Sequence, residues 1–91
     1  MDTAWRVSIL PSAQSELDGL DDRVRDEAVQ AILDLTEDPF LYGSTPLRGH
    51  LGLYRIKFYR GQYRIVYRVS EKRSAVVIWR VRPRGTAYRG L

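Results

Sequence analysis

The chain has 91 residues, of which 44% are hydrophobic and 29% are charged, and it contains no cysteine. This length supports one modest hydrophobic core, and no apolar run approaches the roughly 18 residues of a membrane span. We therefore exclude a membrane-spanning protein and a disulfide scaffold, and we expect one domain over residues 1–91. The N-terminal residues resemble no secretion signal, so the expected location is the cytoplasm.

Charge is distributed unevenly along the chain. Residues 1–47 hold three cations and ten acids, a net charge of −7, whereas residues 48–91 hold twelve cations and one acid, a net charge of +11. A basic half of this kind favours an anionic partner, such as a nucleic acid or an acidic protein segment. The alternative is that acidic helices merely neutralise a basic sheet.

The first half of the chain predicts one strand and two helices. Residues 5–10 alternate with period two and predict a short strand. A helix is predicted to begin at Pro11 and to end near Leu20. A second helix, with an apolar stripe at helical spacing, follows Asp21 and ends at Asp38. The two helices should form a hairpin.

The second half predicts a loop and an antiparallel meander. Residues 39–52 are rich in Pro and Gly and predict a loop. Alternation with period two then predicts strands over residues 53–59, 62–70 and 75–82. The expected fold class is α+β, in the order β-α-α-β-β-β, with the helical hairpin packed on one face of a small antiparallel sheet.

The segment YRIKFYRGQYRIV, residues 54–66, allows a strand register to be predicted. A two-residue turn at residues 60–61 places Lys57 directly opposite Arg64 and puts the apolar and aromatic residues on the other face. Like charges in this position destabilise a sheet, and a bound anion reverses the sign of that interaction. The pattern therefore favours a phosphate-binding surface over the alternative, a solvated face with edge-protecting cations.

The last strand extends this row of cations. We expect Val77, Trp79 and Val81 in the core, with Trp5, and a three-residue turn then places Arg80 opposite Arg64. Further cations, Arg82 and Arg84, continue toward the end of the strand.

Several motifs resemble the RelE/ParE superfamily of toxins from bacterial type II toxin–antitoxin pairs. The similarity spans almost the whole chain, which is identified as a single RelE-like toxin domain. The most specific motifs are Leu-Arg-Gly at 47–49, Tyr-Arg-Ile-Lys at 54–57, Gly-x-Tyr-Arg-x-Val-Tyr at 61–67, and the late pair Arg84 and Tyr88.

The resemblance implies a function and a set of site residues. Toxins of the RelE branch are ribosome-dependent ribonucleases that cut messenger RNA, so the cognate antitoxin, the ribosome and mRNA are the implied partners. The implied catalytic residues are Arg55, Lys57, Arg64, Arg84 and Tyr88. We also expect RNA contacts from Arg48, Arg80 and Arg82.

The implied chemistry is attack of a ribose 2′-OH on the adjacent phosphate, without a metal or cofactor. Lys57 is the candidate base, while Arg64 and Arg84 would stabilise the negative charge of the phosphorane. Arg84 or Arg55 would assist the leaving group, and Tyr88 would stack on a base or orient the 2′-OH. Arg55 stands where a lysine is often found, which leaves the division of proton transfer open.

Two other functions stay open. The ParE branch shares the fold and inhibits DNA gyrase by protein binding, but its members usually lack the full set of basic residues. The third possibility is a basic module that binds RNA or ribosomes without cleaving them. The single histidine, His50, is predicted to be a surface residue of a glycine-rich loop rather than a catalytic acid or base.

Overall fold

The computed structural model describes residues 4–41 and 43–91. Within them, no helix is long and apolar enough to cross a bilayer. The elements in chain order are β1 (Arg6–Ile9), α1 (Pro11–Asp18), α2 (Asp22–Glu37), β2 (Thr45–Pro46), β3 (Leu53–Phe58), β4 (Tyr63–Ser70) and β5 (Ala75–Pro83).

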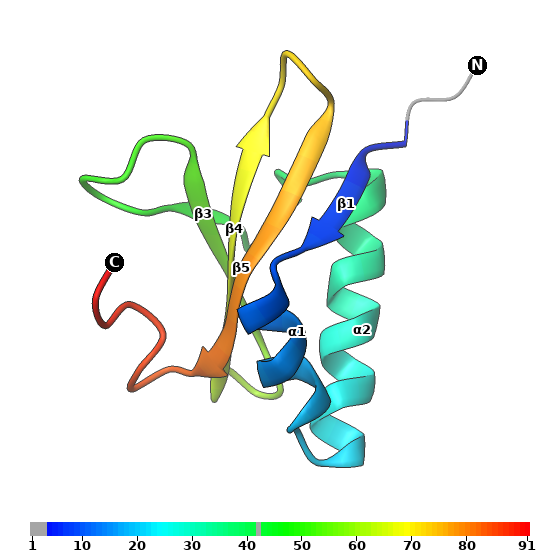
Figure 1. The fold of residues 1–91 in the computed structure, drawn as a ribbon, viewed down its shortest axis with the longest axis vertical. Helices are drawn as coiled ribbons and strands as arrows, with labels where there is room; N and C mark the ends of the chain where they lie inside the picture. Colours follow the sequence, from blue (N-terminus) through cyan, green and yellow to red (C-terminus); the bar gives the residue numbers. More distant parts are fainter. Residues whose placement is uncertain (1–3, 42) are drawn as a thin grey trace.

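The strands form one sheet in the order β1-β5-β4-β3-β2, and both helices pack on one of its faces (Figure 1). The predicted α+β class and the helical hairpin are confirmed. The sheet is mixed rather than antiparallel, because β1 runs parallel to β5. The predicted loop over residues 39–52 also contains the two-residue strand β2, which pairs with β3. We call the face without helices the open face.

Local sequence explains where the helices begin and end. Pro11 occupies the first turn of α1, where its fixed φ suits a helix and its missing N–H leaves no bond unmade. A proline disfavours helical backbone at the residue before it. Asp38, which precedes Pro39, is accordingly extended and ends α2. The buried residues of α2 recur at helical spacing and face the sheet: Val24, Ala28, Ile32 and Leu35.

The core lies between the helices and the sheet. Its largest fully buried side chain is Tyr67, whose hydroxyl donates a hydrogen bond of 2.6 Å to the Pro39 carbonyl. Burial raises the pKa of Tyr67 to about 12, because the phenolate would lose its hydration. The strands contribute Ile56, Phe58, Ile65, Tyr67, Val76, Ile78 and Val81 to this cluster, against which Trp5 also packs.

The β3–β4 hairpin has the predicted register. Lys57 lies opposite Arg64, and the other pairs follow the same offset. The turn needs three successive residues with positive φ, Tyr59, Arg60 and Gly61, which costs little only at the glycine. The Tyr59 N–H donates to Glu27 Oε1 at 3.0 Å, so a carboxylate of α2 anchors the turn.

The predicted register of β5 is wrong. The turn between β4 and β5 has four residues, 71–74, where three were predicted, and this shifts the register by one. A bulge between Val66 and Tyr67 and the facing part of β5 shifts it by one more, so Arg64 lies opposite Arg82 and Arg80 lies opposite Val66. The core residues of β5 are consequently Val76, Ile78 and Val81. Trp79, expected in the core, is only half-buried, and the Arg68 guanidinium lies 5.4 Å from the centre of its ring.

Candidate functional site

Two rows of side chains cross the open face. The first consists of Lys57, Arg64 and Arg82, which are register partners on β3, β4 and β5. The second, beside it, consists of Arg55, Val66 and Arg80. Register partners have their Cβ atoms about 5 Å apart on the same face, so five cations from three strands surround one buried valine.

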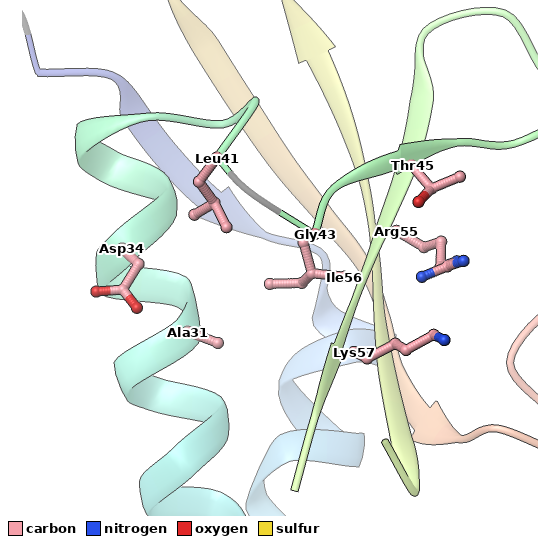
Figure 2. A pocket seen from close by; sticks show the side chains of 8 residues that line it. All are labelled: Ala31, Asp34, Leu41, Gly43, Thr45, Arg55, Ile56 and Lys57. Atoms are coloured by element: carbon pink, nitrogen blue, oxygen red, sulfur yellow. The ribbon is translucent and has the colours of Figure 1, made fainter. Parts of the chain in front are cut away.

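Arg55 and Lys57 extend together from β3, away from α2, as Figure 2 shows. They also line a hollow of about 360 Å³ at the edge of the sheet, between α2 and β3. Asp34 lines the same hollow from α2, and its carboxylate accepts a hydrogen bond of 3.0 Å from the Gln30 side chain. Asp34 forms no ion pair with Arg55 or Lys57, since the ion pairs of the described residues join Arg25 to Asp22 and Arg82 to Glu16.

Arg64 is held beside the hairpin turn. Its Nη1 donates to the carbonyls of Gly61 at 2.6 Å and Tyr63 at 3.2 Å. Its Nε is buried and has no hydrogen-bond partner among the described residues. A buried donor without a partner costs about 1–3 kcal/mol, so stability alone does not account for this arrangement.

Arg82 has a carboxylate partner that the sequence did not indicate. Its Nε lies 2.5 Å from Glu16 Oε2, and the other oxygen of Glu16 accepts the Val81 N–H at 3.0 Å. Glu16 thus ties α1 to the edge of β5 and neutralises one cation of the row. Arg82 was predicted to bind RNA. Because of its ion pair with Glu16, it carries less uncompensated charge than its neighbours.

Arg80 contacts the residues that follow β5. Its Nη1 donates to the carbonyls of Ala87 at 3.2 Å and Arg89 at 2.5 Å. Burial lowers the pKa of the Arg80 guanidinium, and the neighbouring charge of Arg82 lowers that pKa further, while Glu16 opposes both. Its expected RNA contact therefore remains a prediction, and its contacts in the structure are with the protein's own backbone.

The last two predicted catalytic residues follow β5. Arg84 is exposed, and its backbone N–H donates to the Gln62 carbonyl at 2.9 Å, beside the β3–β4 turn. Tyr88 is 41% exposed. It lines a hollow of about 250 Å³ with Leu47, Arg48, His50 and Leu91.

His50 was not expected at this site. It lies in the turn before β3, where its N–H donates to Leu47 O at 3.2 Å and its carbonyl accepts the Leu53 N–H at 3.0 Å. That turn folds back on itself, with positive φ at Gly49 and Gly52, and brings the imidazole to the hollow lined by Tyr88. The two glycines were the available signal for the turn, but nothing in the sequence indicated that the C-terminal residues meet it.

The open face keeps most of its positive charge. The ion pairs that link described residues are Arg25 with Asp22 and Arg82 with Glu16. Within the same part of the chain, Arg55, Lys57, Arg64 and Arg84 therefore have no carboxylate partner. Over residues 4–41 and 43–91, no three His, Cys, Asp or Glu side chains form a group that could hold a metal ion.

Comparisons with known proteins show the family to which the chain belongs. A family model described as "ParE toxin of type II toxin-antitoxin system, parDE" matches residues 7–88. The toxin RelG of Mycobacterium tuberculosis is 34% identical over 87 residues, which cover 93% of this chain and 97% of RelG. The chain therefore belongs to the RelE/ParE superfamily of type II toxins, as its motifs predicted.

Solved structures of RelE proteins share the fold. The isolated E. coli RelE toxin has a TM-score of 0.77 at 26% identity, with 88% of this chain and 84% of that chain covered. The RelBE2 toxin–antitoxin complex of M. tuberculosis has a TM-score of 0.75 at 32% identity, with 89% of this chain and 99% of that chain covered.

Proposed function

We propose that this toxin is a ribosome-dependent endoribonuclease that cleaves mRNA by attack of a ribose 2′-OH on the adjacent phosphate. The observation that carries the proposal is the register of Lys57 against Arg64 on a face where no described carboxylate pairs with either residue. Such a pair is repulsive in the free protein and becomes favourable when a phosphate lies across it.

We assign to the five candidate residues the roles that the family resemblance implies. Lys57, exposed on β3, acts as the base for the 2′-OH, with Arg55 beside it on the same strand. Arg64 and Arg84 stabilise the phosphorane, where negative charge develops, and Arg84 or Arg55 assists the departing 5′ oxygen. Tyr88 stacks on a splayed base or orients the 2′-OH, and Arg48 binds the RNA backbone.

We further propose that residues 1–91 act as one toxin domain in the cytoplasm and that a cognate antitoxin neutralises it. The structure of the RelBE2 complex, in which a related toxin is bound to its antitoxin, supports a partner of this kind. The uncompensated cations of the open face favour an antitoxin segment that carries acidic residues.

Cleavage in a purified translation system tests the proposal. The protein is added to ribosomes engaged on a defined message, and the RNA ends are mapped. We expect cuts that depend on the ribosome and leave a cyclic phosphate on one fragment and a free 5′-OH on the other. An intact message at a toxin concentration that arrests bacterial growth contradicts the proposal.

Gyrase inhibition is the second candidate, because the matching family model is described by the name ParE. In this case, the protein blocks supercoiling of plasmid DNA by gyrase and leaves ribosome-bound message whole. The same preparation is assayed for both activities. Binding of RNA or ribosomes without either activity supports the third reading, a basic binding module.

A further inference from the structure

The residues after β5 cross to the open face. Figure 1 shows residues 84–91 on the side of the sheet opposite the helices, together with the loop that precedes β3. We call residues 84–91 the C-terminal segment. Its backbone forms successive turns rather than a helix, and yet Ala87 is fully buried. Turns have few internal hydrogen bonds, so contacts with the sheet must hold this segment in place.

Val66 shows where the segment lies. Its side chain belongs to the open face and is outside the core cluster, but it is fully buried. Its register partner Arg80 extends from β5 to the C-terminal segment. Since the core does not cover Val66, groups on the open face must do so, and its neighbour Arg80 leads from there to the C-terminal segment.

Arg80 donates hydrogen bonds to the backbone on both sides of Tyr88. The two carbonyls that it binds belong to Ala87 and Arg89, the residues immediately before and after the tyrosine. A guanidinium that bridges these carbonyls fixes the peptide planes on either side of the Tyr88 Cα atom. The direction in which the Tyr88 side chain leaves the backbone then follows from the position of Arg80.

The bulge in β5 makes this contact possible. Without the extra residue, the pairing of Tyr67 with Ile78 would continue along the strands and place Arg80 opposite Ile65, on the face that the helices cover. With the bulge, Arg80 lies on the open face, opposite Val66, next to the segment. Neutral carbonyls accept its hydrogen bonds, so its positive charge still adds to the field of the open face.

We propose that Arg80 is a positioning residue, which fastens the C-terminal segment to the open face and thereby holds Tyr88 as one wall of the hollow that it shares with Arg48 and His50. A nucleobase next to the cleaved phosphate would bind in that hollow, between the aromatic ring and the imidazole. The substrate part of this inference rests on the proposed ribonuclease function. The fastening of the segment does not.

Arg80→Met tests the proposal, because it keeps most of the apolar stem and removes the donors. We expect the ¹⁵N order parameters of residues 86–89 to fall from rigid values to below about 0.6. Single-turnover cleavage of ribosome-bound message should fall about tenfold, since hydrogen bonds from a charged donor are lost. Arg80→Lys, which keeps a cationic donor, should restore most of the order.

Arg68→Met is the matched control. It removes one arginine from the same face, where its guanidinium lies over Trp79 instead of the segment. We expect the order parameters of residues 86–89 to stay at the wild-type values in this variant. An equal loss of order in both variants would mean that general charge on the face, rather than Arg80, holds the segment.

Salt dependence separates the positioning role from a direct phosphate contact. A short single-stranded RNA oligonucleotide is titrated at several salt concentrations with wild-type and Arg80→Met protein. The proposal predicts an unchanged slope, whereas loss of a phosphate contact lowers the slope by about 0.7. A rigid segment in Arg80→Met overturns the proposal, whatever the slope. A loosened segment in a protein that never cleaves RNA refutes the ribonuclease function and leaves the fastening by Arg80 supported.

Discussion

The face of the sheet that packs against α1 and α2 and the face that stays open are formed by alternate residues of the same strands. On the helix side, Ile56 and Ile65 are register partners and are almost fully buried. At the neighbouring pair of positions, one residue after Ile56 and one before Ile65, the partners are Lys57 and Arg64, two cations with no carboxylate partner in the described part of the chain. The face under the helices stabilises the fold by burying apolar side chains, whereas the open face destabilises it through repulsion between cations.

This difference indicates how the chain separates stability from activity. In a strand, successive side chains point to opposite faces, so a substitution at one position leaves the other face intact. Variants of the open face should therefore lose activity with little change in the free energy of unfolding. Variants of the core should lose stability while each folded molecule keeps its activity. Four predictions test this separation.

The largest effect is expected for the double variant Lys57→Ala/Arg64→Ala. Cleavage of ribosome-bound message should fall by about 10³-fold or more, because both the candidate base and a charge that stabilises the transition state are removed. Urea unfolding should change by less than about 1 kcal/mol.

Lys72→Ala/Arg73→Ala is the matched control, since both residues are exposed in the turn between β4 and β5. It removes the same charge and should keep most of the activity. If the control loses as much activity as the Lys57/Arg64 variant, net charge rather than the site accounts for the effect.

Ile65→Ala tests the other face. Ile65 is fully buried between the sheet and the helices, so its truncation should lower the free energy of unfolding by about 3 kcal/mol. Cleavage per folded molecule, measured where the variant is mostly native, should stay within about threefold of wild type. A much larger loss of activity in that folded fraction would show that the two faces are coupled.

Tyr67 gives the core a dependence on high pH. Its pKa is near 10 in the unfolded chain and about 12 in the folded protein, so the stabilisation is complete below pH 10 and disappears as the pH rises to 12. The loss amounts to about 2–3 kcal/mol. Tyr67→Phe should remove this component from unfolding curves measured between pH 9 and about 12. Tyr88→Phe, at an exposed position, should keep it.

The smallest effect should be a gain in stability. Lys57→Met removes one member of the repulsive pair with Arg64, and the free energy of unfolding should rise by about 0.5 kcal/mol at low salt. Added salt should reduce this difference. Lys72→Met in the exposed turn serves as the comparison, and an equal gain there would remove the evidence for repulsion within the row.

The sequence predicted the helices and the β3–β4 hairpin well, because their signals are local. The Arg60-Gly61 turn determines the offset that pairs Lys57 with Arg64. The helices were predicted from Pro11 at the start of α1, Pro39 after the end of α2 and apolar residues at helical spacing. The family motif around Arg55 and the one that ends at Tyr88 each span only a few consecutive residues, so both could also be recognised without the structure.

The remaining features depend on contacts that have no local signal. In β5, apolar residues occupy both phases of the strand, so Val77 and Val76 were equally plausible core residues, and the length of the turn before β5 decided between them. Thr45 and Pro46 have no sequence pattern typical of a strand. They pair with β3 because the loop that contains them runs alongside that strand. The contacts of Glu16 with Arg82 and of Arg80 with the C-terminal segment join positions whose proximity only the folded chain defines.

The pairing of β1 with β5 sets the order in which the molecule can be completed during its synthesis. Arg6 lies beside Ala75, near the other end of the chain, and β5 links that first strand to the rest of the sheet. A growing polypeptide cannot make this contact until Ala75 and the rest of β5 have been translated, and closure across so many residues is slow. The first strand therefore joins the sheet only after β5 has been made, so the layer that covers the core cannot be completed before then.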